Sequence, residues 1–236
     1  MSPAPDPVSL ESLHEEVAAC RACPRLVAWR EKVARAKRAS FADQEYWGRP
    51  VPGFGDPGAW LCIVGLAPAA HGANRTGRMF TGDRSGDWLY RALHRAGFAS
   101  QAESSARADG LTLSGAYVTA VVRCAPPGNK PKPDERDRCL PFLTRELDLM
   151  SSVRVLVALG GFAYGNLSRV LIQRGLGLPR PRPKFAHGLE IPLDGGRWLL
   201  CSYHPSQQNT FTGTLTEEMF DGIWERAKEL RQAARR

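Results

Sequence analysis

Four of the six cysteines in the 236-residue sequence are spaced so that they could bind a metal. Cys20 and Cys23 form the motif CRAC, and Cys124 and Cys139 lie far downstream with fourteen residues between them. Four thiolates suit either a tetrahedral zinc ion or a 4Fe-4S cluster, and the spacing does not separate the two. The alternative is that CRAC arises by chance and that the downstream cysteines are core residues.

The loop GLAPAAHGANRTGRMFTGD, residues 65–83, contains little of the usual acid and base chemistry. It holds four glycines, two arginines, one histidine and a single acid, Asp83. Glycine permits positive φ and close approach, so main-chain N–H groups here could hold water or phosphate oxygens. Such loops are as often simple turns. In TGDRSGDWL, Asp83 also stands where a helix N-cap would lie, so a chemical role and a capping role are both open.

A second polar loop, HPSQQNTFTG, covers residues 204–213 and follows the apolar run WLLCSY. His204 comes directly after this run. An imidazole in that position can donate a hydrogen bond to an oxygen atom that gains negative charge during a reaction. The alternative is that a histidine before proline at a strand end only satisfies nearby backbone groups.

Four short apolar runs predict the strands that position these loops. The runs are residues 60–65, 116–122, 153–160 and 198–203. Cys62 and Cys201 lie inside two of them and are expected to act as small hydrophobes. Helical patterns follow each run, which predicts a parallel sheet covered on both faces, with right-handed crossovers. Ligands bind beyond the carboxyl ends of such strands, where the loops 65–83, 123–133 and 204–213 begin.

The composition narrows the classes of function. Lys and Arg total 32 against 24 Asp and Glu, a formal charge of +8, which favours a polyanionic partner such as nucleic acid. A basic soluble protein shows the same balance. No apolar run reaches the ~20 residues of a membrane span, and the start MSPAPDPVSL lacks the regions of a signal peptide. We expect one cytoplasmic domain over residues 1–236, with residues 1–8 disordered.

The motifs together resemble family 5 of the uracil-DNA glycosylase superfamily over nearly the whole chain. Residues 65–83 look like this family's version of the loop that carries a catalytic acid or amide in other members. HPSQQNTFTG is similar to the His-Pro-Ser loop, and VTAVVRCAPPGNKPKP resembles the base-recognition strand. The resemblance implies a three-layer α/β/α sandwich around a four-stranded parallel sheet. It also implies a 4Fe-4S cluster, with the ligands Cys20, Cys23, Cys124 and Cys139.

The resemblance further implies a base-excision repair enzyme that flips uracil or another deaminated base out of single- or double-stranded DNA. Hydrolysis of the N-glycosidic bond then leaves an abasic site, with positive charge developing on the sugar and negative charge on the base. His204 is the expected donor to the departing base, and Asp83 is expected to orient water or stabilise the sugar cation. The motif loops offer only Lys130 and Lys132, among prolines, so we expect no Schiff-base lyase step. We expect a monomer.

Two alanines stand where stringent relatives carry polar groups, which predicts broad base specificity. Ala67 replaces a group that positions water, and Ala120 replaces an asparagine that reads uracil. Phe80 is expected to stack on the flipped base, a contact that tolerates different bases. Asn129 is a possible substitute contact.

The remaining expected contacts with the base or DNA are Gly65, His71, Ser206 and Asn209. Phosphate contacts are expected from Arg75, Arg78, Lys130, Lys132 and the stretch 174–184, and Phe211 is the candidate wedge that fills the vacated stack. Two other functions fit the same residues. One is a cluster-bearing nucleic-acid binding protein that has lost catalysis through Ala67, and the other is an electron-transfer protein.

Overall fold

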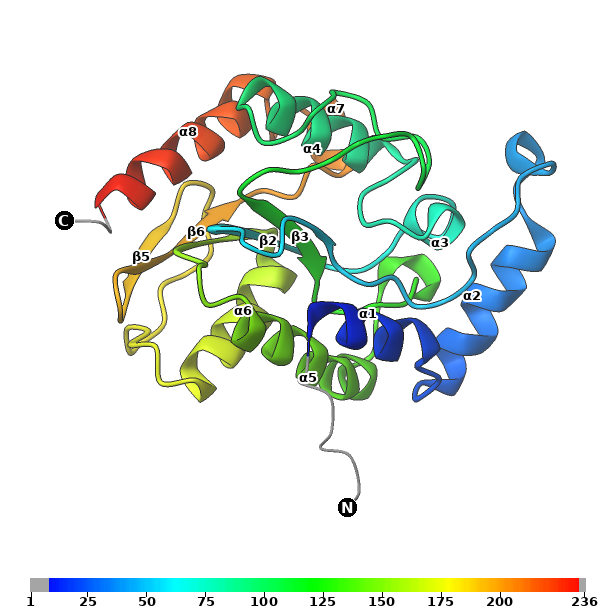
Figure 1. Cartoon of the computed structure of the whole chain (residues 1–236), viewed down its shortest axis with the longest axis horizontal. Coiled ribbons are helices and arrows are strands. Elements are labelled where there is room, and N and C mark those ends of the chain that lie inside the picture. Colours follow the sequence, from blue (N-terminus) through cyan, green and yellow to red (C-terminus); the bar gives the residue numbers. More distant parts are fainter. Residues whose placement is uncertain (1–8, 234–236) are drawn as a thin grey trace, which may run out of the picture.

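A six-stranded sheet with helices on both faces forms the centre of the protein, and a computed structural model describes residues 9–233 (Figure 1). The disorder expected for residues 1–8 lies outside the described residues. The strand order is β1-β3-β2-β4-β6-β5. Four central strands pair in parallel and correspond to the four predicted runs: β3 (Ala116–Ala120), β2 (Leu61–Gly65), β4 (Val155–Leu159) and β6 (Arg197–Ser202). The α/β/α sandwich is therefore confirmed.

The expected count of four strands is wrong, because two antiparallel strands extend the sheet at its edges. β1 (Phe54–Gly55) pairs with β3, and β5 (Glu190–Leu193) pairs with β6. A two-residue strand is too short to give a periodic signal. β5 is joined to β6 through Gly195 and Gly196, both with positive φ, as tight hairpin turns require. That glycine pair was the available signal for the second edge strand.

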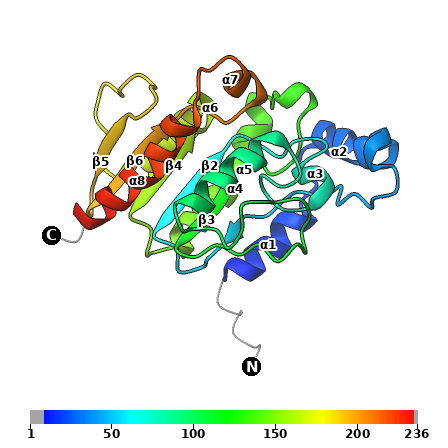
Figure 2. The ribbon, with the colours of Figure 1, turned by 90° about the horizontal axis from the view of Figure 1, so that it is seen from above.

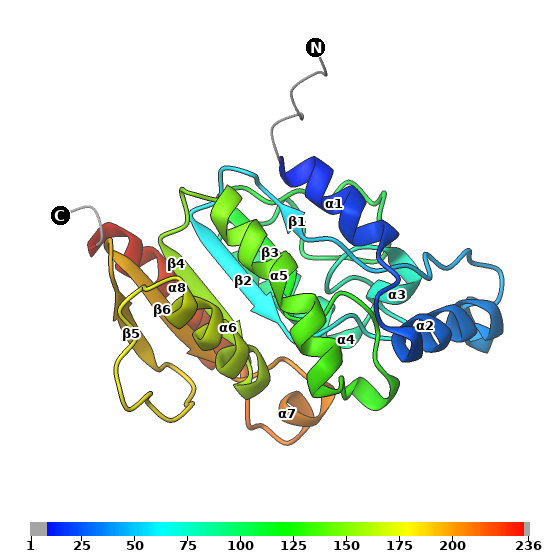
Figure 3. The same ribbon diagram turned by 90° about the horizontal axis from the view of Figure 1, so that it is seen from below.

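The helices form two layers, one on each face of the sheet. α4 (Arg84–Arg95) and α8 (Glu217–Ala233) cover one face (Figure 2), and α1 (Leu10–Ala19), α5 (Pro133–Leu149) and α6 (Gly161–Gln173) lie over the other (Figure 3). The remaining helices are α2 (Pro24–Ala36), α3 (Ala73–Thr76) and α7 (Gln207–Phe211). None of the helices within residues 9–233 has the length and apolarity needed to cross a membrane.

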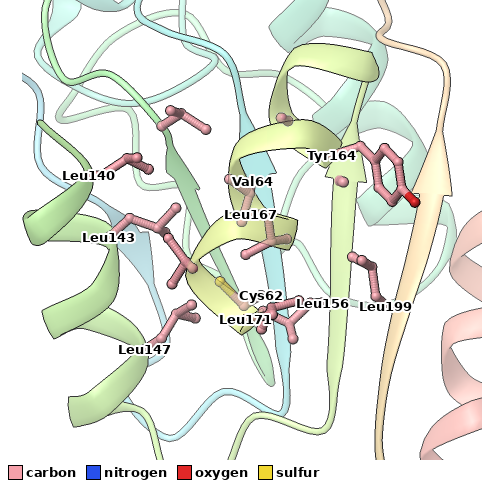
Figure 4. Close-up of a cluster of buried hydrophobic side chains, with 14 of the residues drawn as sticks. Cys62, Val64, Leu140, Leu143, Leu147, Leu156, Tyr164, Leu167, Leu171 and Leu199 are labelled. Atoms are coloured by element: carbon pink, nitrogen blue, oxygen red, sulfur yellow. The ribbon is translucent and has the colours of Figure 1, made fainter. Parts of the chain in front are cut away.

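Apolar side chains fill the space between the sheet and both helical layers, as the continuous apolar runs predict. On the α5 and α6 side, Leu143 and Leu167 pack against Val64 and Leu156 of the sheet (Figure 4). Burying each large aliphatic side chain contributes about 1.5–3 kcal/mol. Cys62 lies in the same cluster with no exposed surface, and burial raises its pKa, so it acts as a small hydrophobe.

One buried carboxylate, that of Glu146 on α5, collects hydrogen bonds from the sheet. Tyr117 Oη donates to it at 3.0 Å and Thr119 Oγ1 at 2.7 Å, and the guanidinium of Arg123 forms a salt bridge with it. Tyr117 Oη also lies 2.7 Å from His14 Nε2. Because the tyrosine gives its proton to Glu146, His14 must be the donor in that contact. The network joins α1, α5 and β3.

Replacing Glu146 tests this network. We expect Glu146→Ala to lower the free energy of unfolding by about 3–5 kcal/mol, because Arg123 would keep a buried and unpaired charge. Urea denaturation of the purified protein measures the change. The control Glu225→Ala removes an exposed partner of Lys228 and should cost under about 0.5 kcal/mol. A loss for Glu146→Ala as small as the control's would contradict the role of the network.

Candidate active site

Three predicted loops meet at one cavity of about 380 Å³, beyond the carboxyl ends of the central strands. β2 and β6 both end near α7 (Figure 3), and residues that follow these two strands line the cavity. The predicted site residues that line it are Ala67, Phe80, Asp83, Asn129, His204 and Ser206. Segments more than a hundred residues apart therefore form one site, at the edge of the sheet that the parallel topology favours.

Phe80 lies between Gly65 at the end of β2 and the imidazole of His204. Its ring centroid is 5.9 Å from that of His204, and the rings are inclined by 31°. A Cβ on Gly65 would come within 2.7 Å of the Phe80 ring, so glycine is required there. Phe80 also has a φ of 52°, a conformation that costs a non-glycine residue about 1–3 kcal/mol. Gly65 thus contributes by leaving space for the ring. Phe80 packs against the core and also lines the cavity.

Asp83 caps a helix and also lines the cavity. Its Oδ1 accepts a hydrogen bond of 3.0 Å from the backbone N–H of Gly86, which caps α4, and its side chain also lines the cavity. Oδ2 lies against Gly72, where a Cβ would be only 2.0 Å away. Burial raises the pKa of Asp83, and the Gly86 hydrogen bond opposes that shift.

His204 is held by its backbone, and its ring lines the cavity. Its carbonyl accepts hydrogen bonds from the N–H of Ser206 at 2.7 Å and from Asn209 Nδ2 at 2.9 Å. On the other side, Gly160 leaves room for the histidine, since a Cβ there would be 3.2 Å from His204 Cβ. Burial lowers the pKa of His204 to about 4, so the ring is neutral near pH 7.

Besides Gly65, two residues that were predicted to contact the base or DNA, His71 and Asn209, do not line the cavity. The ring of His71 lies against Tyr46, whose hydroxyl is 3.0 Å from His71 Nδ1. Asn209 supports the backbone of His204 through the hydrogen bond just described. Both therefore organise the loops around the site.

The expected phosphate contacts of Arg75 and Arg78 are wrong, because both side chains are buried within the loop fold. Arg75 donates hydrogen bonds to the carbonyls of His71 and Gly82, and its guanidinium lies over the ring of Phe41. Arg78 forms a salt bridge with Asp109 at 2.6 Å. Both arginines contribute to the net charge of +8, but as buried side chains they are not part of the surface that could contact DNA.

Arg84, Ser85 and Gln207 also line the cavity, and the sequence analysis did not identify them. Arg84 and Ser85 directly follow the capping Asp83, and Gln207 directly follows Ser206. Their place at the starts of α4 and α7, next to identified residues, was the available signal.

The four predicted cysteine ligands line a separate small cavity between α2, α5 and the loop after β3. Arg30 Nη1 donates to Cys124 Sγ at 2.9 Å, and the backbone N–H of Arg123 donates to Cys139 Sγ at 3.2 Å. Both arginines are buried and line this cavity, and each has a guanidinium N–H without a hydrogen-bond partner.

This donor set fits an anionic group with several thiolate ligands. Unpartnered guanidinium N–H groups beside the thiols favour negative charge in the cavity. A single zinc ion needs its sulfur ligands about 2.3 Å from one point. Within residues 9–233, no three Cys, His, Asp or Glu side chains lie close enough together to hold one metal ion, so the positions of the thiols do not separate zinc from a 4Fe-4S cluster.

Comparison with known proteins identifies the family of the chain. The model of the family "Uracil DNA glycosylase superfamily" matches residues 52–228. The type-5 uracil-DNA glycosylase of Mycobacterium tuberculosis is 56% identical over 223 residues, which cover 94% of this chain and 82% of that protein. The type-5 enzyme of Thermus thermophilus is 54% identical, with coverage of 93% and 97%. A type-4 enzyme of Pyrobaculum aerophilum is 29% identical, with 84% of each chain covered.

These matches extend well beyond the motif loops, and identity is far higher with the type-5 proteins than with the type-4 protein. The chain is therefore a member of the uracil-DNA glycosylase superfamily, in its type-5 group.

Proposed function

We propose that the protein is a DNA glycosylase that hydrolyses the N-glycosidic bond of uracil and of other deaminated bases. The observation that carries this proposal is the joint placement of Phe80, Asp83 and the neutral His204 around one cavity. A cavity of about 380 Å³ is within the range of small-molecule sites, and it has room for a base flipped from DNA.

His204 stabilises the negative charge that develops on the departing base. With a pKa of about 4, the ring is neutral at the pH of the cell and donates one N–H to a base carbonyl oxygen. A preorganised donor is most effective where water is excluded, and a flipped base that fills the cavity would cover the half-buried imidazole. The base leaves as an anion, so the histidine need not transfer a proton.

Asp83 stabilises the sugar cation or orients the water that attacks it. An oxocarbenium ion needs only a weak nucleophile, so a carboxylate can act here through its charge and its hydrogen bonds. The cap on α4 and the close contact with Gly72 hold the carboxyl group in one place. The same burial that raises its pKa strengthens its interaction with a cation.

The cavity favours broad base specificity. Ala67 presents a methyl group, and Ala120 is only 1% exposed in the core, so β3 presents no amide to a base. Phe80 supplies a stacking surface, which every base can use. Asn129 at the rim is the amide left for contact with the base edge.

We also propose that Cys20, Cys23, Cys124 and Cys139 hold a 4Fe-4S cluster. The four iron–thiolate bonds to such a cluster would fix α2, α5 and the loop after β3 relative to one another. Asn129 lies on that loop, five residues after Cys124, so the thiol site positions one wall of the active cavity. This supports a structural role for the cluster, in preference to electron transfer.

The residues around the cavity support hydrolysis without strand cleavage. Within the described residues, no lysine lines it, so no amine is placed to form a Schiff base with the sugar. Lys130 and Lys132 are exposed on the neighbouring loop, and Arg182 and Lys184 are exposed beyond α6. These four cations support contact with DNA phosphates and binding that weakens as salt rises.

The role of His204 is tested by His204→Ala. We expect the single-turnover rate on uracil-containing DNA to fall about 100- to 1000-fold, because one donor to the developing anion is lost. Alkali-labile sites in a labelled oligonucleotide measure the rate. The control Gln208→Ala changes an exposed neighbour and should leave it unchanged. Excision by His204→Ala at the wild-type rate would show that the role is misassigned.

Gly72→Ala tests the placement of Asp83 without changing the acid itself. A Cβ there must displace the carboxyl group, so the rate should fall about 100-fold, as for other small misplacements of catalytic groups. Gly222→Ala on α8 meets no neighbouring atom and serves as the control.

The pH dependence of the rate tests the charge on Asp83. In the wild type the rate should fall as pH drops through the raised pKa of Asp83, and Asp83→Asn should abolish that dependence. An unshifted acid limb in Asp83→Asn would rule out the carboxylate.

A panel of DNA duplexes, each with one modified base, tests the breadth of the pocket. We expect excision of both uracil and hypoxanthine, because no amide from β3 selects the uracil edge. Product formation is measured under single-turnover conditions for each base. Excision of uracil alone would contradict the inference from Ala67 and Ala120.

A further inference from the structure

Phe211 is an exposed aromatic side chain beside the active cavity. It ends α7, whose first residue Gln207 lines that cavity. Its side chain is 62% exposed, the most of any large hydrophobic residue within residues 9–233. A single exposed apolar side chain is common on protein surfaces, so it is the position of Phe211 next to the cavity that singles it out.

The guanidinium of Arg84 lies over the Phe211 ring. Its guanidinium carbon lies 4.2 Å from the ring centroid, within the range of a cation–π contact. Arg84 begins α4 and lines the cavity, so this contact joins the start of α4 to the end of α7. Two exposed side chains from separate elements therefore meet beside the pocket that receives the base.

The chemistry of this pair suits the gap left in a duplex by a flipped nucleotide. An aromatic ring can replace the missing base in the stack. A guanidinium group is planar, so one face can remain on the ring while its N–H edges point to phosphate oxygens. Arg84 can thus orient the ring and contact the DNA backbone at the same time.

We propose that Arg84 is a positioning residue that holds Phe211 for insertion into double-stranded DNA. The inference rests on the proposed glycosylase function, and it concerns the opening of the duplex, a step that single-stranded DNA does not require. The pair should therefore set the relative activity of the enzyme on the two forms of DNA, separately from the chemistry of His204 and Asp83.

The experiment compares kcat/KM for uracil in a duplex with kcat/KM for uracil in the same single strand. We expect Phe211→Ala and Arg84→Ala each to lower the ratio of duplex to single-strand kcat/KM about 10-fold, because the loss of one base–aromatic stacking contact has an effect of about this size. Arg84→Lys keeps the charge but loses the planar group, and it should behave like Arg84→Ala. Arg91→Ala removes an exposed cation from the same helix and should leave the ratio unchanged.

Double substitution tests whether the two side chains act as one unit. In the Phe211→Ala background, Arg84→Ala should lower the ratio by less than about 2-fold, because the ring it positions is already absent. Fully additive losses would overturn the proposal. Equal losses on both forms of DNA would overturn it too, as would a wild-type ratio for Arg84→Lys.

A fluorescence measurement separates this inference from the proposed function. 2-Aminopurine beside a non-cleavable 2′-fluoroarabino uracil reports unstacking of the duplex without excision. Wild-type protein should raise the fluorescence, and Arg84→Ala should reduce that rise. A wild-type rise without any excision of normal uracil would contradict the glycosylase function alone. An undiminished rise for Arg84→Ala would overturn the positioning role.

Discussion

The buried charge of Glu146 is the constraint on which the arrangement of both sites depends. A carboxylate with no exposed surface must be paired, and Tyr117, Thr119 and Arg123 provide the donors. Arg123 in turn places its backbone N–H on Cys139, and the loop that continues from Arg123 carries Cys124 and then Asn129. Packing of α5 on the sheet, the thiol cavity and one wall of the active cavity are thus coupled through a single ion pair.

Burial shifts the pKa values of the two titratable groups, His204 and Asp83, that line the cavity. Burial keeps His204 neutral, which makes it a hydrogen-bond donor that does not titrate near pH 7. Burial also raises the pKa of Asp83, because desolvation destabilises its charged form. Asp83 is the group that would face the sugar cation in the proposed mechanism. In both cases the low polarity of the cavity strengthens interactions with charges that appear only during the reaction.

Close packing decides where these groups lie. Gly65 admits the ring of Phe80, and Gly72 admits the carboxyl group of Asp83, at distances that a Cβ would forbid. Phe80 adopts a strained backbone conformation between them. Strain of this kind persists only where surrounding contacts hold it, and here those contacts include the imidazole of His204. The glycines of the loop 65–83 therefore allow close contact with neighbouring side chains as well as turns of the backbone.

The amino-acid sequence alone determined the four central strands and their order along the chain, because apolar runs report directly which segments are buried. It also identified the three loops, since loops after parallel strands meet at one edge. Tertiary structure decided what each side chain touches. His71 and Asn209 support the loops, Arg75 and Arg78 are buried, and Arg84 reaches the cavity, although their residue types and spacing do not distinguish these outcomes. The short β1 and the hairpin strand β5 formed only by pairing with neighbours already in the sheet. Long-range contacts, which local sequence does not encode, made these choices.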